Sequence, residues 1–372
     1  MNATLRRAVR GLSLVELMVA LVIGSLLIVG ALTVYANSRS TYAVNEAVAR
    51  LQEQGRYALS VIEPDIELAG YYGFTNSPDT LRLVNGAAPE TVLATAVALR
   101  QVPIPPAAAE PVPAPGLGAG ATACGTNFAV DVLRPVQGSN DGFELGPNAG
   151  GDCAAFGAGA VTGSDTLTLR RASIEPVDAE AGRIQILATR FSSQKSQLIF
   201  ADGVATGTLD DDRRVHDLLV RSYYVSQDSD EQPGRPSLRM KALSSAGGAP
   251  VFIDSEVLPG VEDLQVQFGI DTGDYDGDGV IDPAADVNGD GIPESDGRVT
   301  RYVNPDFPEL DRLQVVSVRI WLRLRGERPE PEIDDQRTYR YADVEYTPAG
   351  GERQFRRMLL QQTITLRNSR ML

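Results

Sequence analysis

The side chains best suited to chemistry in this 372-residue chain are the carboxylates of one short segment. Residues 271–297 read DTGDYDGDGVIDPAADVNGDGIPESDG, so acids alternate with glycine and other small residues. Ca²⁺ binds several hard oxygen ligands of this kind on a turn, with a glycine at the sharp bend. We therefore predict calcium as a cofactor, with the ligands Asp274, Asp276, Asp278, Asp282, Asp286, Asn288, Asp290 and Glu294.

The acidic pattern occurs twice, twelve residues apart, and it departs from the EF-hand loop. Ala285 and Gly297 stand where that loop has its bidentate glutamate, and nearby prolines do not suit flanking helices. The repeat is closer to the calcium repeats of thrombospondin type 3, in which the last acid of one loop starts the next. The alternative is a solvated acidic loop without a metal. Catalytic use of the metal is not expected, because no base, nucleophile or phosphate-binding loop accompanies it.

Composition excludes several classes of protein. Lys and Arg number 34 against 49 Asp and Glu, and a net charge of −15 opposes nucleic-acid binding, which needs a basic surface. With a single histidine and two cysteines, an ordinary Cys/His zinc site is not expected. His216 precedes a strand-like run, and we predict it to be a surface residue or the start of a strand. No enzymatic activity is expected.

The two cysteines, Cys124 and Cys153, are flanked by glycines and small polar residues. In an oxidising compartment each has one candidate partner within the chain, so we predict a disulfide between them. Closing a loop of this size stabilises the fold by roughly 3–4 kcal/mol in the chain-entropy model. The alternative is two free thiols. Redox catalysis would need closer spacing or a setting that stabilises the thiolate, and neither is visible.

The N-terminus combines a basic leader with a long apolar run. Residues 1–11 carry three arginines and no acid, and between Leu12 and Ala36 the only charged residue is Glu16. The last 20 residues of this run would form a helix about 30 Å long, the thickness of a bilayer core. The arginines place the N-terminus in the cytoplasm. A cleaved secretory signal has a shorter apolar core, and a plain anchor does not explain the carboxylate.

The string GLSLVE at residues 11–16 resembles the class III signal of type IV prepilins. This resemblance implies that a prepilin peptidase cuts between Gly11 and Leu12 and that Leu12 is then N-methylated. Leu12 replaces the usual phenylalanine, and both are apolar. The resemblance also implies that Glu16 supports filament assembly. A carboxylate in an apolar filament core needs a partner, which the N-terminal amine of a neighbouring subunit would supply. The alternative is a Glu16 side chain that reaches the membrane interface.

Helical spacing continues past the apolar run, so the helix is expected to extend from Leu12 to Glu63, with Pro64 kinking or ending it. Residues 50–74, RLQEQGRYALSVIEPDIELAGYYGF, resemble the corresponding region of the PilW family of minor pilins. The fold that this implies is α+β and type IV pilin-like, with a long N-terminal helix packed on an antiparallel β-sheet. Strands are predicted at Thr166–Arg170, Arg183–Ala188, Gln197–Phe200, Leu218–Val225, Leu238–Leu243, Val261–Phe268, Leu313–Leu324 and Gln361–Leu366.

These features divide the chain into five parts. The leader covers 1–11 and the transmembrane or filament-core helix 12–36. An amphipathic helix at 37–74 continues into the globular part. Residues 75–163 form a loop-rich region with a Pro/Ala-rich loop and both cysteines, and residues 164–372 form a β-rich pilin domain with the acidic loop 271–297.

The resemblance implies a minor pilin of a type IVa pilus that acts in pilus assembly and priming at or near the tip. It implies a single pass through the inner membrane, a periplasmic globular domain, and later transfer to the pilus fibre. The implied partners are the prepilin peptidase, other minor pilins, the major pilin and a PilY-type tip adhesin, with roles in adhesion and twitching motility. Two alternatives remain open. One is a GspJ-like minor pseudopilin of type II secretion, and the other is a membrane-anchored calcium-binding adhesin that never enters a filament.

Overall fold

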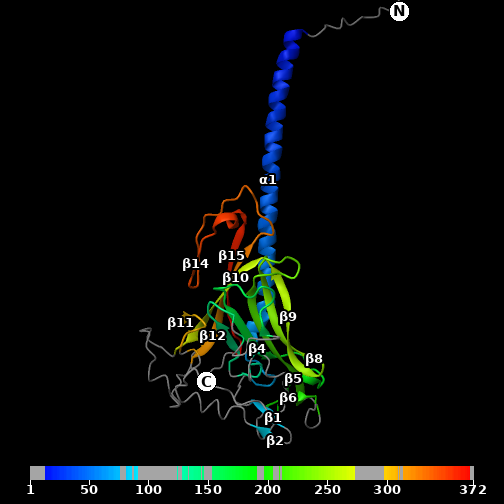
Figure 1. Ribbon diagram of the computed structural model, residues 1–372, viewed down its shortest axis with the longest axis vertical. Coiled ribbons are helices and arrows are strands. Elements are labelled where there is room, and N and C mark those ends of the chain that lie inside the picture. Colours follow the sequence, from blue (N-terminus) through cyan, green and yellow to red (C-terminus); the bar gives the residue numbers. More distant parts are fainter. Residues whose placement is uncertain are drawn as a thin grey trace, which may run out of the picture. The chain divides into compact units, whose positions relative to one another are not determined.

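The structure is a computed structural model that describes residues 13–75, 81–85, 88–90, 124, 128–132, 134–143, 145, 153–190, 197–203, 209, 212–272, 297–308, 310 and 313–368. The leader, the Pro/Ala-rich loop and the eight predicted calcium ligands lie outside these residues. Contacts divide the chain into two units, Met1–Gln52 and Glu53–Leu372. Figure 1 labels the elements of both.

One helix, α1 (Leu14–Glu67), contains the apolar run and the amphipathic stretch. Pro64 lies inside its last turn, so the predicted end at Glu63 falls four residues short. A proline here removes the backbone donor to the Ser60 carbonyl, and it disturbs only the last turn because the helix ends three residues later. Here the following turn is closed by the Leu68 N–H, which donates to the Pro64 carbonyl at 3.2 Å.

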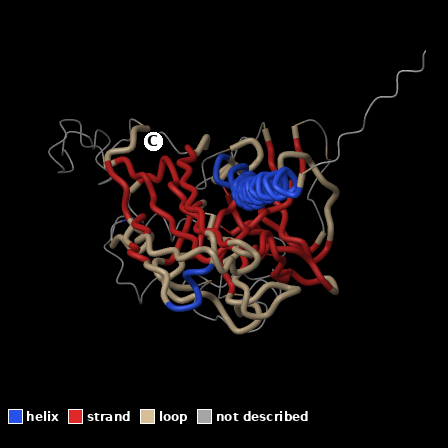
Figure 2. Tube along the Cα trace, turned by 90° about the horizontal axis from the view of Figure 1, so that it is seen from above, coloured by secondary structure: helices blue, strands red, loops and turns tan. Residues whose placement is uncertain are grey.

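Strands are the main secondary structure in the described part of the second unit (Figure 2). The first sheet has nine strands in the order β2-β1-β6-β5-β7-β4-β3, with β8 on β7 and β9 on β8. All of its pairs are antiparallel except that of β1 with β6. Its strands are β1 (Leu81–Asn85), β2 (Ala88–Glu90), β3 (Val136–Ser139), β4 (Thr166–Ala172), β5 (Ala181–Thr189), β6 (Gln197–Asp202), β7 (Arg213–Ser226), β8 (Ser237–Ala246) and β9 (Ala249–Pro259).

The second sheet is antiparallel and has the order β11-β10-β12-β15. A two-stranded ribbon, β13-β14, and a 3₁₀-helix, η6 (Gly350–Gln354), complete the described elements. Each of the eight predicted strands overlaps an observed one, and the predicted α+β class is confirmed. The remaining bounds are β10 (Val261–Asp271), β11 (Arg301–Val303), β12 (Gln314–Arg325), β13 (Tyr339–Tyr341), β14 (Val344–Tyr346) and β15 (Arg357–Thr365).

Two residues just before β4, Ser164 and Asp165, join the two sheets. The Ser164 hydroxyl accepts the Leu264 N–H at 3.0 Å, and the Asp165 N–H donates to the Leu264 carbonyl at 2.8 Å. The Asp165 carboxylate accepts the Val266 N–H at 2.8 Å and the Asp141 N–H at 2.9 Å. Burial raises the pKa of Asp165 to about 7. This group of bonds fixes the position of β10 against the first sheet.

His216 lies inside β7 and is 2% exposed, so its predicted place at the surface or at the start of a strand is wrong. The strand begins at Arg213 because its first residues pair with β5, where His216 stands opposite Ile186. His216 Nδ1 lies 2.8 Å from the Ser173 carbonyl oxygen. Burial lowers the pKa of the imidazole. These contacts make the only histidine a buried residue of the sheet.

Candidate functional site

The first turn of α1 holds the acid that the sequence singled out. The Glu16 N–H donates to Ser13 Oγ at 3.1 Å, and the Glu16 carboxylate accepts the Ser13 N–H at 2.9 Å. This reciprocal pair is a capping box, which satisfies donors that a helix start leaves without partners. Glu16 is exposed, so its carboxylate faces the surroundings of the helix. The predicted cleavage positions, Gly11 and Leu12, lie outside the described residues.

The N-terminal half of α1 presents apolar side chains on every face. Fifteen large apolar side chains between Leu14 and Tyr35 are each more than half exposed. In the described part of the chain, α1 is the one helix long and apolar enough to cross a membrane. A helix that is apolar all round belongs inside a membrane or inside a protein assembly.

The C-terminal end of α1 is joined to the first sheet by a buried carboxylate, Asp65, which is 1% exposed. Arg171 on β4 approaches one carboxylate oxygen at 2.8 Å, and Arg221 on β7 approaches the other at 2.9 Å. The Tyr223 hydroxyl donates to the same carboxylate at 2.6 Å, and burial raises the pKa of that hydroxyl. Charge-assisted hydrogen bonds of this kind are stronger than neutral ones. Asp65 thus fixes the helix end on two neighbouring strands.

Gly55 lets α1 approach the second sheet closely. A Cβ atom at this position would meet the Leu360 side chain and lie 3.5 Å from Leu324 Cδ1. Glycine costs a helix interior about 1 kcal/mol relative to alanine. Here the missing side chain admits leucines from β12 and β15. The segment Glu53–Glu67 therefore packs on both sheets, through Gly55 on the second and Asp65 on the first.

The two cysteines form the predicted disulfide. Their Cα atoms are 5.2 Å apart, and both side chains are buried, at 1% and 0% exposure. They belong to an apolar cluster of the first sheet that also contains Phe128 and Phe252. The bridge ties a segment of the loop-rich region to this core.

The ends of the acidic segment are held together by a hairpin. Strands β10 and β11 pair antiparallel, with Ile270 opposite Arg301. The Thr300 N–H donates to the Ile270 carbonyl at 2.9 Å, and the Thr272 N–H donates to Thr300 Oγ1 at 3.2 Å. The segment between these ends, with all predicted calcium ligands, lies outside the described residues. Among the residues that the structure describes, no group of three or more His, Cys, Asp or Glu side chains is arranged to hold a metal ion.

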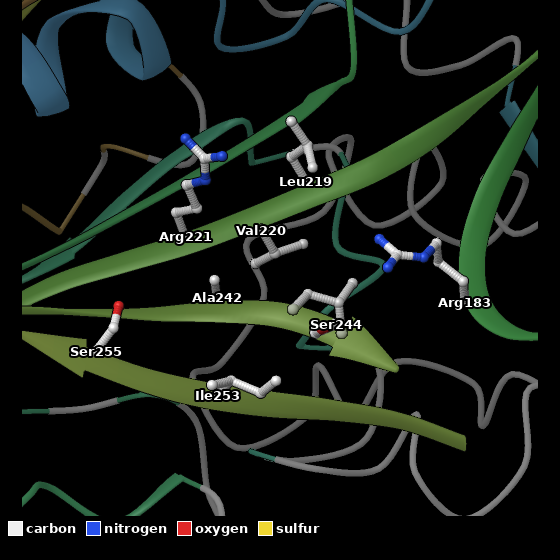
Figure 3. A pocket seen from close by; sticks show the side chains of 9 residues that line it. Arg183, Leu219, Val220, Arg221, Ala242, Ser244, Ile253 and Ser255 are labelled. Atoms are coloured by element: carbon white, nitrogen blue, oxygen red, sulfur yellow. The ribbon is translucent and has the colours of Figure 1, made fainter. Parts of the chain in front are cut away.

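A hollow lies on the face formed by β7, β8 and β9 (Figure 3). Its floor includes Leu219, Ala242 and Ile253, and Ile253 is 50% exposed. Arg183 and Arg221 stand on opposite sides of it. Both guanidinium groups already bind acids, Arg221 through Asp65 and Arg183 through Asp217 at 3.0 Å. The hollow is therefore a weakly polar surface beside the end of the helix.

Comparison with known proteins gives two family matches. Residues 6–32 match the Prokaryotic N-terminal methylation motif, and residues 222–368 match Type IV Pilus-assembly protein W. No curated protein matches the chain. Among solved structures, the chain is similar to a Type IV-like pilin from Thermus thermophilus. The identity is 15%, the match covers 51% of this chain and 85% of that one, and the TM-score is 0.23.

A methylation motif over the start of an apolar helix, with the end of that helix fixed on antiparallel sheets, defines a type IV pilin-like protein. Such proteins are structural components. Within this class, the part of the chain from the middle of β7 to just beyond β15 matches the PilW family. The predicted family is thereby confirmed.

Proposed function

We propose that this chain is a minor pilin of a type IVa pilus, which a prepilin peptidase cleaves between Gly11 and Leu12 and which then helps to prime pilus assembly at or near the tip. The observation that carries the proposal is the methylation motif on a helix whose apolar half is exposed. The leader arginines support a cytoplasmic N-terminus and a periplasmic globular domain. The PilW match favours a pilus over a type II secretion system.

The proposed partners are other minor pilins, the major pilin and a PilY-type tip adhesin. The apolar half of α1 would pack among the helices of such partners, while the globular domain supplies contacts between subunits. A single helix exposed on all faces supports this arrangement, because it has a partner surface in every direction.

Mass spectrometry of the protein from native membranes and from sheared pili tests this function. We expect a mature chain that begins with N-methylated Leu12 in both fractions. Cells that lack the prepilin peptidase are the control, and there the chain should retain its leader and be missing from pili. An intact leader in cells with an active peptidase would contradict the proposal, as would a processed chain that never reaches the pilus.

We also propose that the acidic loop binds calcium. The β10–β11 hairpin supports this, because it holds the two ends of the acidic segment side by side and so closes the loop. Many acids in a closed loop repel one another without a cation, and Ca²⁺ would relieve that repulsion. The ion would then contribute to the stability of the second sheet.

Replacing Asp276 and Asp290 with alanine is expected to remove the calcium response of thermal stability. For the unchanged chain, calcium at 100 times its dissociation constant should add about 2.7 kcal/mol to the free energy of unfolding. The measurement is thermal unfolding with calcium and with a chelator. The control variant replaces two exposed acids elsewhere, Glu327 and Glu332, and should respond like the unchanged chain. An equal response from both variants would place the calcium elsewhere or exclude it.

A further inference from the structure

Strand β15, drawn in red in Figure 1, lies at one edge of the second sheet. It pairs with β12 over its whole length without a register shift. Two backbone bonds show which residues face β12. The Leu366 N–H donates to the Val316 carbonyl at 2.9 Å, and the Gly326 N–H donates to the Arg356 carbonyl at 2.8 Å. The backbone N–H and C=O groups of the even-numbered residues of β15 therefore point toward β12.

In an antiparallel ladder, alternate residues turn both the N–H and the C=O to the same neighbour. The odd-numbered residues Gln361, Thr363 and Thr365 therefore turn these groups to the outer edge of the sheet. Within the described part of the chain, no backbone bond reaches them. Their side chains are exposed. The edge thus presents three N–H groups and three carbonyls in a row.

Natural proteins usually protect such an edge with lysine, proline, a bulge or a covering segment. The sequence of residues 361–365 is QQTIT, without a charge or a proline, and the ladder has no bulge. The inner face of the strand is fixed, because Leu360 packs against Gly55 of α1. The edge is therefore already ordered, so binding of a partner strand would not carry the cost of ordering β15.

A positive charge lies beside this edge. Arg319 on β12 donates from Nε to Thr363 Oγ1 at 3.4 Å, and its guanidinium lies 3.4 Å from the centre of the Tyr302 ring. Two other arginines on this face, Arg323 and Arg357, bind Glu262 at 3.2 and 2.7 Å. Among the described residues Arg319 has no acidic partner. A carboxylate on a strand beside Thr363 would meet this guanidinium.

We propose that the β15 edge from Gln361 to Thr365 docks an extended segment of another pilus subunit, which carries an acidic side chain facing Arg319. This inference rests on the proposed role in pilus assembly and names one contact that the role uses. Addition of a strand to an open sheet edge is a common mode of recognition, with affinity from the backbone and specificity from side chains. A second copy fits less well, because pairing two β15 edges around Thr363 would bring two Arg319 side chains together.

The test compares Thr363→Pro with Thr363→Ala in cells that make the full chain. Proline removes only the outward N–H, so the bonds to β12 remain, and prolines are tolerated on exposed edges. We expect the proline variant to fall at least ~10-fold in sheared pili and in detergent-extracted pilin complexes. The alanine variant keeps the backbone and should remain within about twofold of the unchanged chain. Equal incorporation of both variants would overturn the proposal.

Two further measurements distinguish a loss of binding from a folding defect. Arg319→Glu is expected to lower incorporation and Arg319→Lys to retain it, with thermal midpoints unchanged. Hydrogen exchange should slow by about tenfold or more at the Gln361, Thr363 and Thr365 amides when the chain is in the extracted complex. In the purified chain, protection of the same amides from exchange that increases with protein concentration would identify a second copy as the occupant. That result would overturn the choice of partner. An unchanged chain that is missing from pili would overturn the pilus role together with this inference.

Discussion

A chain with Glu16 replaced by alanine is expected to be cleaved and methylated normally and yet to be missing from pili. The cleavage positions precede Glu16, and the replacement leaves the apolar run intact. What it removes is the carboxylate that would pair with the N-terminal amine of a neighbouring subunit. An amine buried in an apolar assembly without a counter-charge is strongly unfavourable, so incorporation should fall by at least ~10-fold.

The capping box at the start of α1 provides the matched control. Glu16→Gln keeps an oxygen that accepts the Ser13 N–H, so the helix cap is retained while the charge is lost. We expect this variant to fail in assembly as well. The measurement is the ratio of the chain in sheared pili to the chain in membranes. If glutamine restores incorporation, the role of Glu16 is to cap the helix, and the proposed charge pairing is wrong.

Replacing Asp65 with alanine is expected to cause the largest loss of stability in the globular unit. The change leaves Arg171 and Arg221 facing each other without their shared acid, and Arg171 is largely buried. Removing one partner of a buried ion pair costs roughly 3–5 kcal/mol, because the remaining charge is uncompensated. Urea unfolding of the full chain in detergent, followed by the fluorescence of the single tryptophan, Trp321, measures this loss.

Glu67 supplies the control for Asp65, since it lies in the same helix turn and binds Arg367 at 2.9 Å. Arg367 is 68% exposed, and an exposed ion pair contributes about 0–1 kcal/mol. Glu67→Ala should therefore leave the unfolding midpoint nearly unchanged. Equal losses for the two variants would show that Asp65 does not have the special role we give it.

The course of the helix and of the central strands was predictable because their patterns are local. The apolar run with its lone Glu16 and the alternation along β12 are each contained in one short stretch of sequence. They can therefore be recognised without knowing the fold. Strand β9 was missed, although Gly247 and Gly248 form the two-residue turn that joins it to β8, both with positive φ. Such a glycine pair is a hairpin signal, and it was sufficient to predict the strand.

The contacts of Asp65 that fix the end of α1 on the first sheet were not predictable in the same way. Asp65 lies in the stretch 50–74 that resembles the PilW family, but nothing in the neighbouring sequence shows which residues bind its carboxylate. Arg171 and Arg221 lie 106 and 156 residues further along the chain. Only the pairing of β4 with β7 brings these two arginines side by side. Buried polar contacts between distant segments depend on topology, which a local pattern does not contain.

The exposed apolar half of α1 limits the environments that this helix can occupy. Burying a large apolar side chain is worth about 1.5–3 kcal/mol, so transfer of these fifteen side chains into water costs roughly 20–45 kcal/mol. The helix therefore partitions between apolar phases and does not pass through solution. Replacing bilayer lipid with neighbouring helices would change the free energy of these apolar side chains very little, because both environments are apolar and exclude water. In the assembly proposed above, the direction of transfer would then depend on the few polar contacts that differ between the membrane and the filament, and on work supplied from outside the subunit.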